Sequence, residues 1–377
     1  MKPLAAIAFF STLVLLTSTA HAQLYVSQGD IDAYDPNTGT VDHTATSTDG
    51  SEDETTAVGS NGLIYEAGMY TDPSGNQSVT VNIYNQDLTL NTADVVDVTA
   101  TPVPGSTNTS YGSNGITASS DGSVYVLNSA FNASTIISIN ETTGAVNSTF
   151  SSIAHDNYSG LAASSDGSVL FTTDYQLGTI AEISATTGAL INQSFATYYD
   201  PINPQYGYNG QAGTGQDITV DGNIIYVIDR DDNTVQTFDA TTGALLNNNF
   251  LNVAENPSTG YFGDFLVSIT SEGNSVYVLD GASQTVYQFN ASTGAPIGSV
   301  ALSGSGPIEP GSIAVISDDI STPVEGAPYE GGDPPLNTPS PSDVPEPRSG
   351  VMALCVAMVT VAMVVRRRFT SETSSPA

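Results

Sequence analysis

The pentapeptide DRDDN near the middle of the chain has the residue types and spacing of a calcium-binding loop. Its D-x-D-x-N pattern places oxygen ligands at alternate positions, on Asp229, Asp231 and Asn233. The sequence departs from an EF-hand loop at two points, because Thr234 replaces the glycine at position six and Ala240 replaces the acid at position twelve. Calcium is the one cofactor that the sequence suggests. The alternative is a polar bend between two strands, where short polar residues are expected in any case.

Groups able to perform acid–base catalysis are few. The span 23–343 contains no lysine and no cysteine, so histidine supplies its only bases that titrate near neutral pH, at His43 and His155. His155 is followed by Asp156, an acid that could orient its ring. His155 is therefore the one candidate catalytic residue, weighed against the plainer reading of a surface histidine.

The charge of the chain excludes several classes of partner. Between residues 23 and 344 there are 37 acidic residues and a single basic one, Arg230, which gives a formal charge of −36. Nucleic-acid binding and attraction to anionic lipid require clusters of Lys and Arg, so neither is expected. Self-repulsion of this size favours a saline or calcium-containing exterior, although acidic surfaces also serve solubility alone.

The elements that must position these residues come from a repeat. Each copy carries an Asp-Gly or Asn-Gly turn, a run like Val-Tyr-Val, a run like Thr-Val-x-x-Phe and a Thr-Gly turn. Gly122, Gly167, Gly222 and Gly273 mark the first turn at intervals of 45, 55 and 51 residues. Four clear copies, a degraded one and a truncated one occupy residues 116–146, 161–190, 218–245, 269–296, 57–90 and 23–39.

Four short strands per copy at this period predict an all-β fold, a six-bladed β-propeller of four-stranded antiparallel blades over residues 23–320. The first copy lacks its first strand, and residues 311–316 resemble such a strand with nothing after them. Pairing the two would close the ring, which hides sheet edges. A seventh blade is the alternative, within residues 85–115.

The repeat resembles the NHL and YVTN-type propellers, most closely over residues 225–229 and 234–243. The resemblance spans most of residues 23–320 and implies the propeller fold. Such propellers include ligand scaffolds, lyases and lactonases, so the fold alone does not select a function.

Strand parity assigns the connections to the two faces of the ring. The tight Asp-Gly and Thr-Gly turns share one face, and all the long variable segments share the other, which we call the loop-rich face. A functional site is expected there. Its aromatic residues would either bind a glycan or protein, or support the long loops; they are Tyr111, Tyr158, Tyr198, Tyr199, Tyr206, Tyr208, Tyr261 and Phe262.

The N-terminus has the pattern of a secretory signal peptide. Residues 1–22 contain one basic residue, an apolar run and an A-x-A cleavage site formed by Ala20 and Ala22. The exported chain is expected to begin at Gln23.

The C-terminus has three parts in a fixed order. Residues 321–343 are rich in Pro, Gly and acidic residues and predict an extended stalk. The apolar run 350–365 predicts a single transmembrane helix, and residues 369–377 a cytoplasmic tail. The corner before the run and the basic residues after it are Val344, Pro345, Glu346, Pro347, Arg366, Arg367 and Arg368.

Residues 344–368 resemble the PEP-CTERM sorting signal, which implies recognition by a membrane enzyme of the exosortase type. A plain membrane anchor is the alternative. The resemblance also implies bacteria that produce exopolysaccharide. We therefore expect a protein outside the cytoplasmic membrane, held by its C-terminal helix and then released to the cell surface or matrix. It would act as a non-enzymatic binding or extracellular-matrix protein, with exopolysaccharide or a surface protein as partner. The alternative is a hydrolase or lyase, of the lactonase or streptogramin-lyase kind, with its site on the loop-rich face.

Overall fold

The computed structural model of the chain describes twelve segments of the repeat region. They are residues 23–27, 30–46, 52–71, 77–99, 111–130, 133–153, 158–174, 177–198, 217–229, 234–252, 266–303 and 312–316. All lie in the first of two units of the chain, residues 1–334. The predicted signal peptide, stalk, sorting signal and cytoplasmic tail lie outside the described residues. Within those residues no helix is long and apolar enough to cross a membrane.

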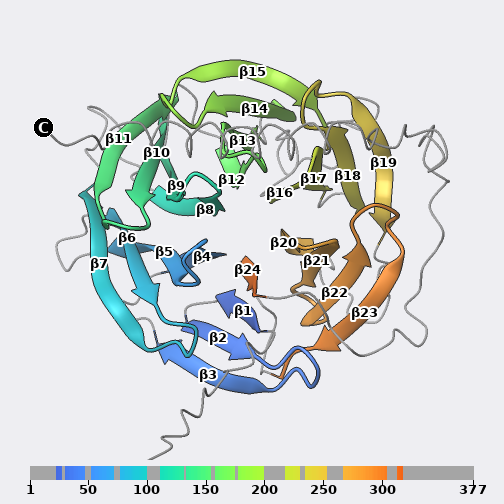
Figure 1. Ribbon diagram of the computed structural model, residues 1–377, viewed down its shortest axis with the longest axis horizontal. Coiled ribbons are helices and arrows are strands. Elements are labelled where there is room, and N and C mark those ends of the chain that lie inside the picture. Colours follow the sequence, from blue (N-terminus) through green and yellow to red (C-terminus); the bar gives the residue numbers. More distant parts are fainter. Residues whose placement is uncertain are drawn as a thin grey trace, which may run out of the picture. The chain divides into compact units, whose positions relative to one another are not determined.

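The described strands form a six-bladed β-propeller, as the repeat predicts (Figure 1). Each blade is a four-stranded antiparallel sheet with its first strand innermost. Blades 1 to 3 consist, from the inside outward, of β24 (Ser312–Val315), β1 (Leu24–Ser27), β2 (Asp30–Tyr34), β3 (Val41–Thr46); β4 (Glu52–Val58), β5 (Ile64–Thr71), β6 (Gln77–Tyr84), β7 (Leu90–Thr99); and β8 (Tyr111–Ser119), β9 (Ser123–Ala130), β10 (Ala133–Asn140), β11 (Val146–Ile153). Blades 4 to 6 consist of β12 (Tyr158–Ala163), β13 (Val169–Asp174), β14 (Thr179–Ser184), β15 (Leu190–Thr197); β16 (Ile218–Asp221), β17 (Ile224–Asp229), β18 (Thr234–Asp239), β19 (Leu245–Asn252); and β20 (Leu266–Glu272), β21 (Ser275–Asp280), β22 (Thr285–Asn290), β23 (Pro296–Ala301).

The ring is closed by the two ends of the repeat region. Strand β24 pairs antiparallel with β1, and the register runs from Leu24 opposite Val315 to Ser27 opposite Ser312. The predicted pairing of residues 311–316 with the truncated first copy is thus confirmed. The blade count is six, and the region 85–115 contributes β7 and β8 to blades 2 and 3. Because residues 24–315 complete every blade, the propeller needs no other part of the chain to close.

One aromatic side chain per blade fills the space between blades. It occupies the second position of the Val-Tyr-Val-like run on the second strand, and its exposure is 2% or less in every blade. The six are Tyr25, Tyr65, Tyr125, Phe171, Tyr226 and Tyr277. Three of the hydroxyls donate to a turn carbonyl of the following blade: Tyr25 to Gln86 at 2.9 Å, Tyr125 to Ala185 at 3.1 Å and Tyr226 to Ala291 at 2.6 Å. The repeated tyrosine therefore joins neighbouring blades by apolar packing and by a hydrogen bond.

Buried tyrosine hydroxyls should make the fold lose stability steeply in alkali. Burial, with neighbouring carboxylates, raises the pKa of Tyr34, Tyr125 and Tyr158 from 10.0 to about 12. An acid whose pKa is raised by folding stabilises the fold below its unfolded pKa, so this stability is complete below pH 10 and declines as the pH rises towards 12. The chain has 18 tyrosines, so exposed ones should ionise near pH 10 first. The remaining tyrosinate absorbance should then appear together with the loss of circular dichroism in the window up to pH 12, and complete ionisation near pH 10 with the fold intact would contradict the prediction.

Four of the five Thr-Gly turns between the third and fourth strands press against the outer strand of the preceding blade, a contact that we call the inter-blade joint. The exception is blade 3, where nothing lies within 4 Å of a Cβ added to Gly144. Gly188, with φ at 69°, lies so close to Phe150 of blade 3 that an added Cβ would overlap the carbonyl oxygen of Phe150. The same joint recurs between Gly243 and Phe195, between Gly294 and Phe250, and between Gly39 and Ala301. Glycine is thus required here for its positive φ and for its lack of a side chain.

Blade 2 forms this joint differently. Leu88 stands in the turn with φ at 57°, a conformation that is strained for a bulky residue. Its side chain is buried in the cluster between blades 1 and 2, where it packs with Tyr25, Ala33 and Ala45. The small side chains of blade 1 leave room for the leucine, so apolar burial offsets the backbone strain.

Substitution of Leu88 should separate the two effects. Leu88→Ala removes the buried side chain and keeps the positive φ, so we expect a loss of about 2–5 kcal/mol. Leu88→Gly removes slightly more side chain but relieves about 1–2 kcal/mol of backbone strain. Urea unfolding should therefore find the glycine variant less stable than the parent and more stable than the alanine variant. An alanine variant more stable than the glycine variant would show that Leu88 is unstrained.

Candidate functional site

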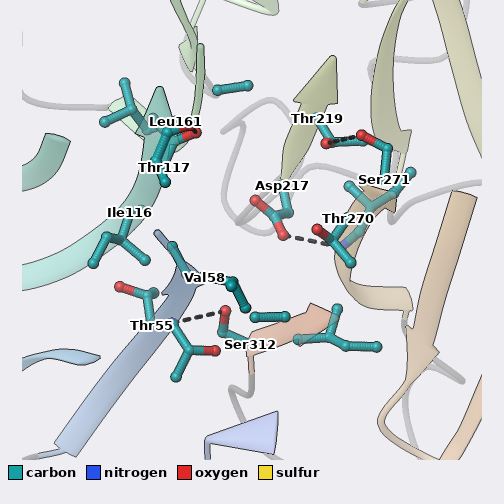
Figure 2. A pocket seen from close by; sticks show the side chains of 18 of the residues that line it. Thr55, Val58, Ile116, Thr117, Leu161, Asp217, Thr219, Thr270, Ser271 and Ser312 are labelled. Atoms are coloured by element: carbon teal, nitrogen blue, oxygen red, sulfur yellow. Dashed lines mark hydrogen bonds between the residues drawn. The ribbon is translucent and has the colours of Figure 1, made fainter. Parts of the chain in front are cut away.

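The innermost strands of the blades surround a central channel of about 740 Å³. Strands β4, β8, β12, β16, β20 and β24 line it, and consecutive ones are neighbours around the whole ring (Figures 1 and 2). Residues before or at the start of these strands, such as Asp217 and Ser159, lie towards the loop-rich face. Residues at their ends, such as Glu272 and Ser60, lie towards the face of the tight turns.

The channel wall consists mainly of hydroxyls, small aliphatic groups and backbone. Among the described residues that line it, Asp217 and Glu272 carry the ionisable side chains, and they lie at opposite ends. Half-buried hydroxyls include Thr117, Thr219 and Thr270, which hold equivalent positions in blades 3, 5 and 6. The wall is thus polar and nearly uncharged in a chain whose net charge is −33.

Side chains at one repeated strand position tie neighbouring blades together. The position is the one directly before an isoleucine of the innermost strand, and it is occupied by Asp217, Ser268 and Ser312 in blades 5, 6 and 1. Each of these side chains accepts a backbone N–H from the next blade. The donors are Ile269 to Asp217 at 3.0 Å, Ile313 to Ser268 at 3.1 Å and Thr56 to Ser312 at 3.1 Å. Innermost strands of different blades do not belong to one sheet. Side-chain acceptors therefore satisfy backbone groups that would otherwise have no strand partner.

Glycines take this position in blades 3 and 4. A Cβ added to Gly115 would lie 2.7 Å from the backbone nitrogen of Leu161, so the strands approach too closely for a side chain. At this level of the channel the innermost strands of the two blades are joined through Thr117, whose hydroxyl accepts the N–H of Ala163 at 3.3 Å. Many channel hydroxyls therefore serve the structure of the ring.

Asp217 begins a chain of hydrogen bonds that reaches the closing strand. Its Oδ2 accepts the hydroxyl of Ser268 at 2.7 Å as well as the N–H of Ile269, and the hydroxyl of Ser268 in turn accepts the N–H of Ile313 on β24. Burial raises the pKa of Asp217 from 3.8, while the hydrogen bonds from Ile269, Ser268 and Ile218 act in the opposite direction. The carboxylate thus couples blades 5 and 6 to the strand that closes the ring.

Asp217 and Ser268 are not among the site residues that the sequence predicts. The signal was present, because a small polar residue precedes isoleucine in Asp217-Ile, Ser268-Ile and Ser312-Ile. Its meaning depends on which strands are neighbours across blades, and the repeat alone does not give that contact.

The aromatic residues expected on the loop-rich face are only partly described. Tyr158 and Tyr198 are buried, with exposures of 0% and 4%, and the Tyr198 hydroxyl donates to the carbonyl of Asp174 at 2.8 Å. These two support the base of the loops and are not available for surface binding. The side chain of Tyr111, and Tyr199, Tyr206, Tyr208, Tyr261 and Phe262, lie outside the described residues.

Residues 23–343 contain two histidines, and the structure describes only one of them, His43. His43 is exposed on β3, the outer strand of blade 1, away from the channel. His155 lies outside the described residues, so its catalytic role stays a prediction.

The calcium motif begins at a position that the repeat uses to cap a turn. Asp174 and Asp280 end the second strands of blades 4 and 6, as Asp229 does in blade 5. Asp174 accepts the N–H of Leu177 at 2.9 Å, and Asp280 accepts the N–H of Ala282 at 3.0 Å. These bonds favour the polar-bend reading for the first residue of the motif.

The rest of the motif is not described. Asp229 accepts the side-chain amide of Gln236 at 3.0 Å, while Asp231 and Asn233 lie outside the described residues. Within the described part, no three His, Cys, Asp or Glu side chains lie close enough together to hold a metal ion. Calcium binding at residues 229–233 stays a prediction. Calorimetric titration with calcium at constant ionic strength tests it. Heat of binding that is lost in Asp231→Asn would support a site in this motif, whereas heat unchanged by that substitution would show that calcium only screens the negative charge of the protein.

The comparisons with known proteins agree with the fold. No protein-family model and no curated protein matches the chain. Among solved structures, a protein of unknown function from Bacteroides caccae is similar at 12% identity and a TM-score of 0.52, over 79% of this chain and 100% of that one. A chain in a nidogen/laminin complex is similar at 11% identity and a TM-score of 0.49, over 78% and 98%. At such identities the likeness concerns the fold alone: this is a six-bladed β-propeller protein.

Proposed function

We propose that this chain is an exported propeller that acts as a non-enzymatic binding protein at the cell surface or in the extracellular matrix. The C-terminal PEP-CTERM-like segment would sort it, with an exosortase-type enzyme as its processing partner. The ligand would be an exopolysaccharide or a surface protein. The observation that carries the proposal is the division of the ring into a closed, cross-linked scaffold and a single face that bears every long connection.

The scaffold suits a binding role because it holds its loops in fixed positions. Tight turns are capped by their own side chains, as where Asp239 accepts the N–H of Thr241 at 3.0 Å and of Thr242 at 2.8 Å. The ring is closed by β1 and β24 and braced by the inter-blade joints. Variable loops on a rigid support are the usual arrangement of binding proteins.

An enzymatic function finds less support in the described channel. General acid–base catalysis needs a pair of positioned groups, usually carboxylates or a histidine with an acid. The ionisable residues among the described channel-lining side chains are Asp217 and Glu272, at opposite ends. The Oδ2 of Asp217 is engaged with blade 6.

A pull-down with the extracellular polysaccharide of the producing cells tests the binding function. Residues 23–343 should be retained, and Tyr261→Ala with Phe262→Ala in the segment after β19 should weaken retention. Leu246→Ala, on the exposed side of β19, is the matched control and should retain the parent's binding. Failure to bind the polysaccharide or any surface partner would overturn the proposal.

Mass spectrometry of the mature C-terminus tests the sorting. Processing near Pro345 would remove the arginines after residue 365. Arg366 retained in surface-exposed protein would indicate a plain membrane anchor.

A further inference from the structure

The carboxylate of Asp217 lies at the loop-rich end of the channel. One oxygen, Oδ2, is fixed by two bonds from blade 6, and the other, Oδ1, accepts the N–H of the adjacent Ile218 at 2.9 Å. Figure 2 shows one oxygen joined to blade 6 and the other turned away from that bond. The acid is therefore held in one orientation, and Asp217 is among the residues that line the channel and is as a residue only partly buried.

The described structure supplies no basic side chain to neutralise this acid. None of the described residues that line the channel is a lysine, arginine or histidine, and His43 is on an outer strand. Burial disfavours the charged form of Asp217, which is why its pKa is raised. A positively charged group in the channel would reverse that effect by direct attraction.

The wall around Asp217 offers both polar and apolar contacts. Thr219 and Thr270 line the same channel (Figure 2), and the hydroxyl of Thr219 also lies 3.0 Å from that of Ser271. The half-buried Val220 and Val267 of the same two strands line the channel and pack against the apolar clusters between blades. An ammonium group could donate to the carboxylate and the hydroxyls while an attached alkyl group contacts the aliphatic wall. The channel volume is within the range of small-molecule sites.

We propose that the loop-rich end of the channel binds a small organic cation, a primary ammonium with a short apolar body, and that Asp217 is its counter-ion. The proposal rests on the channel alone and requires neither export nor matrix binding. It explains why the channel wall carries a single carboxylate at this end, whereas the acids of the tight turns are exposed to solvent.

The strong negative charge of the whole chain requires a matched control. Any cation is attracted to a protein of net charge −33, and this attraction is weakened by salt. Glu272→Gln removes one negative charge at the other end of the same channel. It therefore reproduces the change in net charge and leaves the proposed site intact.

Calorimetry or NMR titration of residues 23–343 with n-butylammonium, at constant ionic strength, tests the proposal. Asp217→Asn should weaken binding at least tenfold and Glu272→Gln less than twofold, while n-butanol should bind no better to the parent than to Asp217→Asn. Equal weakening by both substitutions would show that only the net negative charge of the protein attracts the cation, and it would overturn the proposal. Equal binding of butanol and butylammonium to the parent would overturn it too, as would no binding.

Folding of the variants is protected by the repeat itself. The amide oxygen in Asp217→Asn can still accept the bonds from Ser268 and Ile269, and only the bond from the adjacent Ile218 to Oδ1 is lost. Asp217→Ser is the second variant, because Ser268 and Ser312 hold the equivalent position in blades 6 and 1 and accept the same kind of N–H bond. Both variants should lose butylammonium binding, and retention by a folded Asp217→Ser protein would contradict the assignment.

Discussion

Alanine in place of Gly188 is expected to destabilise the propeller by about 3–5 kcal/mol, from two sources. The positive φ of 69° costs about 1–2 kcal/mol once a Cβ is present. That Cβ would also overlap the carbonyl oxygen of Phe150, and because backbone cannot move aside as a flexible side chain can, relieving the overlap must shift blade 4 away from blade 3. The loss should appear as a lower urea midpoint.

The chain contains a matched control for the strain. Gly122 has φ at 82°, and nothing lies within 4 Å of a Cβ added there. Gly122→Ala should therefore show the backbone cost alone, about 1–2 kcal/mol. The difference between the two variants measures the inter-blade joint. Equal losses of stability at Gly188 and Gly122 would mean that blade 4 can move away from blade 3 without a loss of free energy. The inter-blade joint would then contribute nothing to stability.

The repeat predicts the architecture because its signals are local. Asp-Gly and Thr-Gly turns need glycine where φ is positive, and a truncated copy at one end with an unaccompanied strand at the other specifies how the ring closes. Gly122 and Gly188 both supply the positive φ that their turns need, so the sequence predicts both turns equally well. It does not reveal that a Cβ at Gly188 would meet the preceding blade and that a Cβ at Gly122 would meet nothing.

Contacts between blades lie beyond the repeat. Leu88 stands where the other blades have a turn glycine, and it packs in one cluster with the small Ala33 and Ala45 of blade 1, which are distant in the sequence. Tyr158 and Tyr198 belong to segments rich in polar loop residues, yet their rings are buried beside Asp174. Asp217 is recognised as a channel residue only when the neighbouring strand β20 is in place.

The calcium-like motif at residues 229–233 illustrates the same limit. The D-x-D-x-N spacing from Asp229 is typical of calcium loops, but spacing also arises wherever strand ends repeat a capping residue. Asp174 and Asp280 show that capping use in blades 4 and 6. A motif inside a repeat should therefore be compared with the equivalent positions of the other copies before a ligand is assigned to it.

Ser268 offers the second large effect, at the closure of the ring. Ser268→Ala removes the acceptor of the Ile313 N–H on β24 and one of the donors to Asp217. An unsatisfied buried donor costs about 1–3 kcal/mol, and β24 is attached to blade 1 through only four paired residues of β1. We therefore expect the loss to be concentrated at the closure, as local opening of β24 from β1.

Native-state hydrogen exchange measures this opening directly. Amides of Leu24–Ser27 and Ser312–Val315 should exchange roughly 10–100 times faster in Ser268→Ala, the equivalent of about 1.4–2.7 kcal/mol. Thr117→Val is the matched control, because it removes the acceptor of the Ala163 N–H between blades 3 and 4, away from the closure. It should speed exchange in β12 and leave β24 unchanged. Uniform acceleration in both variants would mean that the ring opens only as a whole, and that the hydrogen-bond chain from Asp217 to Ile313 does not hold the closing strand in particular.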